Sequence, residues 1–180
     1  MRALLIIDML RDFVEEGAPL EVPGARDLVP TIARLADAFR EAGELVVHVW
    51  DEHYPGDPEF KVWGEHAVAG TEGAEPVEGL EPEEGDVVVR KRKYSGFYGT
   101  TLDYDLRVRG ARELYLTGVC TDVCVLFTCA DALMRGYDVK VVRDCVASLD
   151  EEAHRFALEH MERLGAELVT SEEVLRGLEG

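Results

Sequence analysis

Short runs of Val, Ile and Leu alternate with amphipathic stretches along almost the whole chain. This alternation is typical of a parallel sheet with helices packed against both faces. The runs predict strands at residues 3–8, 45–50, 87–90, 113–117, 139–143 and 167–170. We therefore expect an α/β protein built on a doubly wound parallel sheet.

Between these strands, apolar residues recur at helical spacing. The first predicted helix has five of them before the stop signal of Gly43: Leu28, Ile32, Leu35, Ala36 and Phe39. Later helices are predicted over residues 101–109, 122–135 and 151–164, with a short one from residue 172. Residues 51–86 have no regular pattern and are too many for an idle connection, so we expect this loop to carry function.

The ends of the strands collect reactive side chains. In open sheets of this kind, ligands bind beyond the carboxyl ends of the strands, where the direction of winding reverses. Asp8 ends the first predicted strand, Asp51 follows the second, Lys91 follows the third, and Cys124 opens the helix after the fourth. We expect these four side chains to meet at one edge of the sheet.

Cys124 is the candidate nucleophile. Residues 116–124 read LTGVCTDVC, a strand that runs into a glycine turn and then a helix with Thr121 as its predicted N-cap. Such a cap places Cys124 in the first turn, where the helix dipole lowers the pKa of a thiol. A lone cysteine in such a run is more often a small core residue, which is how we interpret Cys129 and Cys145.

A nucleophilic thiol needs a base, and Asp8 is the candidate. A carboxylate in a partly desolvated crevice has a raised pKa and can accept the thiol proton, while the Lys91 ammonium offsets the charge that develops. Taken alone, an aspartate at a strand end is more often structural. The histidines offer no clear alternative, because His48 lies in a predicted strand and His154 and His160 on a late, highly charged helix.

The long loop begins with a candidate metal site. Asp51 and His53 stand two apart on an extended segment and so point the same way, and the loop can return His66 to them, with Glu59 lying between. Mixed oxygen and nitrogen ligands suit Zn, Fe or Mn and leave positions open for water or substrate. An Asp-x-His pair by itself is common in proteins without a metal.

Composition narrows the classes of partner. The 37 acidic and 19 basic residues give a net charge of −18, which opposes binding to nucleic acid and to acidic membrane surfaces. The 180 residues suit a single domain, residues 1–180. The first apolar run is too short for a signal or membrane segment and is broken by Asp8, so we expect a cytoplasmic protein with its four cysteines as thiols.

The sequence contains no Asn or Gln, so an oxyanion hole must use backbone N–H groups in place of side-chain amides.

Over nearly its full length the sequence resembles the isochorismatase-like cysteine hydrolases, and among them the nicotinamidases. The matching runs are LLIIDMLRDF at the start, DEH and EFKVWGEHAVAGTEGAE in the long loop, KRKYSGFYGTTLD after the third strand, and LTGVCTDVCV. The resemblance implies a three-layer α/β fold with six parallel strands. It also implies hydrolysis of a small-molecule amide, with nicotinamide converted to nicotinate and ammonia.

The resemblance implies a catalytic triad of Asp8, Lys91 and Cys124. It also implies a non-proline cis peptide between Val119 and Cys120, with the N–H groups of Cys120 and Cys124 forming the oxyanion hole. The resemblance also implies one divalent metal ion, with zinc favoured over iron or manganese. Its ligands would be Asp51, His53 and His66, with Glu59 as a fourth ligand that only some members have. Three aromatic residues match positions that line a flat pocket: Phe13, Trp63 and Tyr94.

Two departures from the family pattern lie beside the pocket. Leu10 and Arg11 stand where many members have Gln and Asn, so the hydrogen bonds of those amides are absent or replaced. Gly64 and Glu65 stand where nicotinamidases commonly carry prolines before the last metal ligand. Both departures leave the reaction type intact but bear on the identity of the substrate.

Other functions remain to be weighed against this hypothesis. An amide or carbamoyl hydrolase of the same superfamily would use the same thiol on a non-pyridine substrate. A nucleotide- or flavin-binding module has little support, because the chain has neither G-x-G-x-x-G nor G-x-x-x-x-G-K-[ST]. The intact triad counts against an inactive scaffold, and the sequence leaves a homo-oligomer open.

Overall fold

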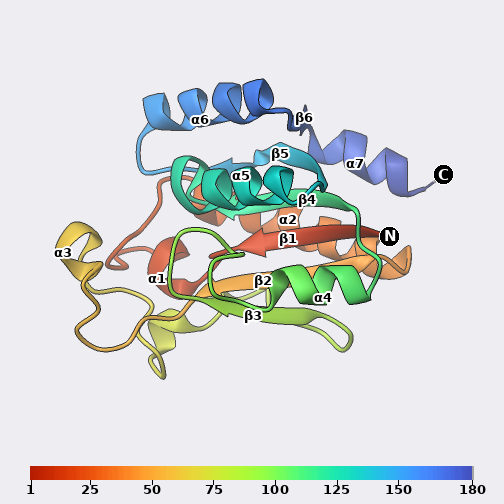
Figure 1. Ribbon diagram of the computed structural model, residues 1–180. Helices are drawn as coiled ribbons and strands as arrows, with labels where there is room; N and C mark the ends of the chain where they lie inside the picture. The colour runs from red at the N-terminus through yellow and green to blue at the C-terminus, as the bar shows by residue number, and fades with distance from the viewer. Residues whose placement is uncertain (180) are drawn as a thin grey trace.

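The computed structural model describes residues 1–179 and contains one six-stranded sheet (Figure 1). All neighbouring strands are parallel, in the order β3-β2-β1-β4-β5-β6. The strands are β1 (Arg2–Ile7), β2 (Leu45–Asp51), β3 (Val87–Lys91), β4 (Glu113–Val119), β5 (Asp138–Ala147) and β6 (Glu167–Val169). All six predicted strands are confirmed, and the winding direction reverses between β1 and β4.

Helices cover both faces of the sheet, so the molecule has three layers. One core layer includes side chains of α4 (Leu102–Val108), α5 (Leu126–Met134) and α6 (Glu151–Leu164). The opposite layer includes side chains of α1 (Arg11–Val14), α2 (Ala25–Glu41) and α7 (Ser171–Leu178). The doubly wound α/β fold expected from the sequence is therefore confirmed.

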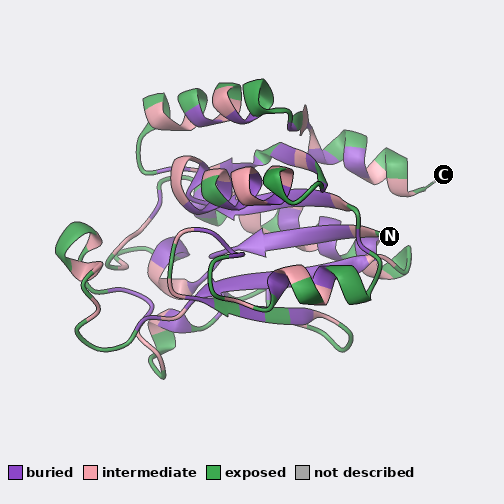
Figure 2. Ribbon diagram, in the orientation of Figure 1, coloured by how far each residue is buried: buried purple, intermediate pink, exposed green. Residues whose placement is uncertain are grey.

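The central strands are apolar on both sides because each side meets a helical layer (Figure 2). In β1, Leu5 and Ile7 pack into the core with α5, whereas Leu4 and Ile6 pack into the core with α2. This double burial explains the unbroken hydrophobic run at the start of the sequence. Among residues 1–179, no helix is long and apolar enough to cross a membrane.

The structure differs from the predicted elements at three places. β5 continues to Ala147, so Cys145 lies inside the strand rather than at its end. The long loop contains two short turns, α3 (Phe60–Trp63) and the 3₁₀ helix η1 (Glu72–Ala74). The segment after β4 begins as a π-helical turn, η2 (Thr121–Val125), before it continues as α5. Elements of one turn carry too little periodicity to be read from sequence.

Gly118, at the end of β4, allows the close approach of β1 at the point of reversal. Its φ is +104°, and a Cβ built on it would lie 2.0 Å from the carbonyl oxygen of Ile7. Only glycine fits this combination of conformation and contact. The residues that follow Ile7 and Gly118, including Asp8 and Cys120, are thereby brought to the same end of the sheet.

Candidate active site

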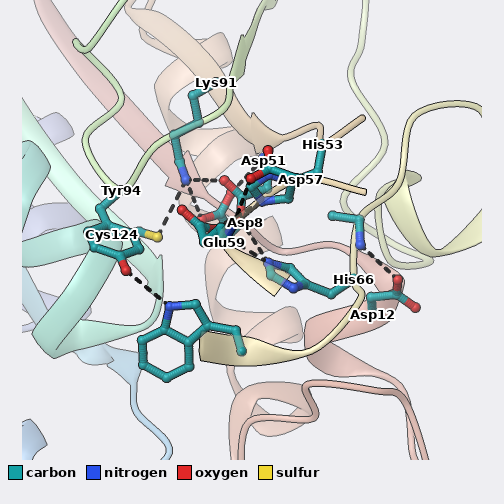
Figure 3. Close-up of polar contacts among 12 residues, drawn as sticks. Asp8, Asp12, Asp51, His53, Asp57, Glu59, His66, Lys91, Tyr94 and Cys124 are labelled. Atoms are coloured by element: carbon teal, nitrogen blue, oxygen red, sulfur yellow. Dashed lines mark hydrogen bonds and ion pairs between the residues drawn. The ribbon is translucent and has the colours of Figure 1, made fainter. Parts of the chain in front are cut away.

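The buried ammonium of Lys91 joins the reactive groups that follow four different strands (Figure 3). Its Nζ lies 2.9 Å from Asp8 Oδ2, 2.5 Å from Asp51 Oδ1 and 3.4 Å from Cys124 Sγ. Asp51 and Lys91 are register partners on β2 and β3, and the Asp51 N–H donates to Asp8 Oδ1 over 2.8 Å. The sheet edge therefore brings together all four side chains that the strand ends predict. We call Asp8, Lys91 and Cys124 the thiol wall.

Asp8 is held as a carboxylate with an unusually high proton affinity. Burial raises its pKa to about 6, and the charge of Asp51 adds to this shift. Lys91 and a hydrogen bond with Cys124 act in the opposite direction but do not cancel it. Asp8 also has a positive φ of 53°, an unfavourable conformation for a residue with a side chain. These properties fit a base that accepts a proton near neutral pH.

The thiol of Cys124 does not have the low pKa expected from a helix N-terminus. Burial raises its pKa well above the ordinary value, and the lowering effect of Lys91 is opposed by Asp8 and Asp51. That expectation was wrong because sequence shows the helix start but not the complete desolvation of the sulfur. The resting group is a neutral thiol, so forming the nucleophile requires transfer of its proton to a neighbouring base.

The turn that carries Cys124 also differs from the expected capped helix. Cys120 occupies the N-cap position of η2, and its carbonyl accepts the N–H groups of Val123 and Val125, both over 3.1 Å. The Thr121 hydroxyl does not cap the helix but pairs with Nδ1 of His154 on α6, over 2.8 Å. His154 therefore contacts the turn that carries Cys124, which its position on a charged helix did not predict.

The peptide between Val119 and Cys120 is cis, as the family resemblance implies. All four cysteines are free thiols and buried. Cys129 and Cys145 both pack in the core, where burial raises the pKa of each to about 12. Their interpretation as core residues agrees with these positions.

Four side chains converge beside the thiol wall and could hold a metal: Asp51, His53, Glu59 and His66. Their nearest ligand atoms all lie within 4.8 Å of one another. His53 Nε2 is 3.3 Å from Asp51 Oδ2 and 3.2 Å from Glu59 Oε2, and His66 Nε2 is 3.6 Å from Asp51 Oδ2. We call this set the metal wall; Asp51 belongs to it and also pairs with Lys91.

Nδ1 of each histidine, the ring nitrogen that does not face the other ligands, already has a hydrogen-bond partner. His53 Nδ1 pairs with Asp57 Oδ2 over 3.0 Å, and His66 Nδ1 pairs with the Gly64 carbonyl over 2.8 Å. Nδ1–H donation leaves the Nε2 lone pairs facing the carboxylates, an arrangement common around metal-binding histidines. His53 Nε2 is buried without a hydrogen-bond partner among residues 1–179. Asp57 therefore supports His53, and no spacing pattern in the sequence identifies it.

Four of the six separations among these ligand atoms suit a small divalent metal ion. Zinc bonds to nitrogen and oxygen at about 2.1 Å, which sets neighbouring ligand atoms about 3.4 Å apart. The three nitrogen–oxygen distances of 3.2 to 3.6 Å in the metal wall are close to this value, and the distance of 3.9 Å between His66 Nε2 and Glu59 Oε2 is somewhat longer. Burial raises the pKa of Asp51, but Lys91 and the two histidines outweigh it and keep Asp51 ionised, with a pKa well below its ordinary value.

A small pocket opens beside Cys124 and the metal wall. Its lining contains the three predicted aromatic residues, Phe13, Trp63 and Tyr94, together with Cys120 and Cys124. Trp63 Nε1 donates to Tyr94 Oη over 3.1 Å, which fixes the two rings relative to each other. Three further lining residues are apolar and were not predicted: Leu20, Val123 and Leu149.

The departures from the family pattern have structural explanations. Leu10 is fully buried, and its carbonyl accepts the N–H groups of Phe13 and Val14, so it starts α1 rather than supplying an amide. Gly64 has a φ of +77°, which proline cannot adopt, and it supplies the carbonyl that orients His66. The ligand loop is therefore held by a glycine turn.

Comparisons with known proteins agree with this geometry. The family model for the isochorismatase domain matches residues 2–173. The isochorismatase family protein PncA of Bacillus subtilis is 38% identical over 171 residues, which cover 88% of this chain and 93% of the relative. Maleamate amidohydrolase of Pseudomonas putida is 31% identical over 185 residues, covering 98% of this chain and 86% of the relative. The crystal structure of Pyrococcus horikoshii pyrazinamidase in complex with zinc superimposes with a TM-score of 0.90 at 35% identity, covering 94% of this chain and 98% of that one.

Proposed function

Because the chain belongs to the isochorismatase family of hydrolases, we propose that it is a metal-assisted cysteine amidohydrolase that converts nicotinamide to nicotinate and ammonia. The observation that carries this proposal is an aromatic cavity lined both by the Cys124 thiol and by three members of the four-residue ligand cluster, Asp51, Glu59 and His66. The relative crystallised with zinc, a pyrazinamidase, supports the same assignment.

The thiol wall would supply the covalent chemistry. Asp8 accepts the Cys124 proton as the sulfur attacks the amide carbon, and Lys91 balances the negative charge of both groups. The backbone N–H groups of Cys120 and Cys124 are proposed to hold the resulting oxyanion, at a typical value of about 3 kcal/mol for each donor. Asp8 returns its proton to the departing nitrogen, ammonia leaves, and a thioester remains on Cys124.

The second half of the reaction restores the enzyme. Water attacks the thioester carbon while Asp8 accepts a water proton, and the carbon–sulfur bond then breaks. Asp8 returns that proton to the sulfur to regenerate the thiol, and the released acid ionises to nicotinate. A divalent ion held by the metal wall would bind the pyridine nitrogen and so orient the ring. The rings of Phe13, Trp63 and Tyr94 would contact the two faces and edges of a flat substrate.

The lining of the cavity favours a neutral amide over one that carries a carboxylate. Among residues 1–179, no arginine or lysine lines this cavity, whereas Asp51 and Glu59 do. An amide such as maleamate brings a carboxylate that needs a cationic partner. The buried Lys91 is already paired with two carboxylates. The cation left for a substrate carboxylate would be the ion held by the metal wall, in competition with the pyridine nitrogen of nicotinamide. Hydrolysis of carboxylated amides is therefore the second candidate function.

Ammonia release distinguishes these functions. Nicotinamide and maleamate are compared as substrates of the zinc-loaded enzyme, of the chelator-treated enzyme and of Cys124→Ala. We expect nicotinamide to be the better substrate and its hydrolysis to need both the thiol and the metal. A zinc-loaded enzyme that hydrolyses maleamate but not nicotinamide would contradict the proposed substrate, and activity in Cys124→Ala would contradict the thioester mechanism.

A further inference from the structure

Asp12, on the one-turn helix α1, reaches the backbone of the metal wall (Figure 3). Its Oδ2 accepts the N–H of Ala67 over 2.9 Å. Ala67 directly follows His66 and has a φ of +44°, a conformation that an alanine rarely adopts. The contact therefore fixes the chain in an unfavourable turn immediately beside a candidate ligand.

The same residue, Ala67, connects the backbones of the two histidines. The Ala67 carbonyl accepts the N–H of His53 over 2.9 Å, and the Ala69 N–H donates to the His53 carbonyl over 2.8 Å. Ala67 therefore contacts Asp12 through its N–H and His53 through its carbonyl. A displacement of Ala67 would move the backbone of both His53 and His66, although Asp12 touches neither imidazole through an identified hydrogen bond.

Gly73, in η1, provides the space in which the Asp12 carboxylate lies. A Cβ built on Gly73 would lie 2.1 Å from Asp12 Oδ2 and 2.2 Å from its carboxyl carbon. The φ of Gly73 is outside the left-handed range, so here it is space rather than backbone conformation that requires glycine. The Arg11 N–H donates to the Glu75 carbonyl over 3.0 Å and holds α1 against this turn.

We propose that Asp12 is a positioning residue for the metal ligands and that Gly73 is required to seat it. This inference rests on the proposed metal-assisted function, because it concerns the same ligand set. Asp12 acts through the Ala67 peptide, and its loss would allow the turn at Ala67 to relax and separate His53 from His66. Outer contacts of this kind typically change metal affinity by about 10- to 100-fold.

Zinc affinity of the full chain, measured by competition with a chromophoric chelator, tests the proposal. Asp12→Ala and Gly73→Ala should each weaken zinc binding about 10- to 100-fold, the second without altering Asp12 itself. Asp12→Asn keeps the shape and one acceptor oxygen and should retain most of the affinity. The matched control is Gly177→Ala, because a Cβ at Gly177 meets no atom within 4 Å and its φ is outside the left-handed range.

Urea unfolding of the metal-free variants separates positioning from general destabilisation. We expect metal-free Asp12→Asn to unfold like the wild type and Gly177→Ala, which lies in α7, to be at least as stable, because alanine favours a helix over glycine by up to about 1 kcal/mol. Zinc should raise the unfolding midpoint of Gly73→Ala less than that of Gly177→Ala. If Asp12→Ala does not fold, the comparison of Gly73→Ala, Asp12→Asn and the control decides the question. Wild-type zinc affinity in folded Asp12→Ala or Gly73→Ala would overturn the proposal.

The same measurements distinguish this inference from the proposed function. A wild-type enzyme that binds zinc but does not hydrolyse nicotinamide would overturn the proposed substrate and leave the role of Asp12 to be decided by the affinities. An active enzyme whose zinc affinity is unchanged in either folded variant, Asp12→Ala or Gly73→Ala, would overturn only the positioning role. A wild type without zinc affinity would overturn both.

Discussion

The thiol wall and the metal wall face the same cavity but are built in different ways. Asp8 directly follows β1 and Lys91 ends β3, with β2 between these two strands. Cys124 lies on the helical turn after β4. His53, Glu59 and His66 lie on a loop that contains only one-turn helices. That loop is held in place by individual contacts, such as those of Asp57 and the Gly64 carbonyl.

This difference suggests a division of tasks within the site. The groups proposed to break the amide bond are fixed by the sheet, whose central strands β1, β2 and β4 are buried on both faces. Three of the four groups proposed to hold the metal lie outside the sheet, on a connecting loop, where functional residues commonly occur. Asp51 is the connection, because it ends β2, pairs with Lys91 and faces both histidines.

Cys124→Ala should produce the largest effect and should affect only the thiol wall. Without a sulfur no thioester forms, so kcat for nicotinamide should fall by roughly 10⁴-fold or more. Zinc affinity should stay at the wild-type value, because Cys124 is not part of the metal wall. The second group of close ligand atoms, on Asp8, Asp51 and Cys124, already surrounds the Lys91 ammonium. Ammonia release and zinc titration on one preparation measure both. A large loss of zinc affinity would show that the two walls are not separable.

His66→Ala is the reciprocal variant and should act on the metal wall. Losing a ligand should cost more than the roughly 100-fold that loss of a supporting contact typically costs in metal affinity. The rate at which iodoacetamide alkylates Cys124 in the metal-free protein should be unchanged, since His66 does not contact the thiol wall through any hydrogen bond identified here. An alkylation rate that changes with zinc affinity would break the comparison.

The pH dependence of activity should report the base of the thiol wall. Asp8 has a pKa raised to about 6 by burial and by Asp51, and it acts only when deprotonated. In zinc-saturated enzyme, kcat/KM should therefore fall about tenfold for each pH unit below 6 and level off above 7. Alkylation of Cys124 in the metal-free protein should show the same inflection. If the pH profile of kcat/KM has this inflection but the pH profile of alkylation does not, the titrating group belongs to the metal ligands and not to Asp8.

The sequence predicted the thiol wall better than the metal wall for a physical reason. In a parallel sheet the carboxyl ends of all strands lie at one edge, so locating the strands was enough to group Asp8, Asp51, Lys91 and Cys124. The ligand set was suggested by its spacing and completed by motif resemblance, and the three aromatic residues came from resemblance alone. The structure places the four ligands together and lines one cavity with the aromatic residues and with Asp51, Glu59 and His66.

What the sequence could not predict depends on burial and on contacts between distant segments. The raised pKa of Cys124 follows from complete desolvation beside two carboxylates, which no local pattern reveals. The pairing of Thr121 with His154 joins residues 33 positions apart. Asp12 and Asp57 support the ligands through loop geometry, where neither strand nor helix periodicity applies.

The anchor at the far end of the ligand loop offers the smallest and most specific test. Asp86 precedes β3 and is nearly inaccessible, with Oδ2 accepting from Arg40 Nη2 over 2.7 Å, from His48 Nε2 over 3.1 Å and from the Glu83 N–H over 2.9 Å. Burial raises the pKa of Asp86, but these donors, with Arg40 first, outweigh it and leave the pKa below its ordinary value.

Asp86→Asn keeps the shape of this side chain but removes its charge and replaces one acceptor with a donor. We expect a loss of about 2 kcal/mol in the free energy of unfolding at pH 7, measured in urea, because the lost hydrogen bonds are charge-assisted. A carboxylate with a depressed pKa stabilises the fold above its unfolded pKa and ceases to do so as the pH falls, so the difference from wild type should shrink below about pH 4. Since Asp86 anchors the loop away from the ligands, zinc affinity and kcat should remain those of the wild type. A loss of zinc affinity as large as that expected for Asp12→Ala would mean that the loop responds as one unit and that its ligands are not held by local contacts.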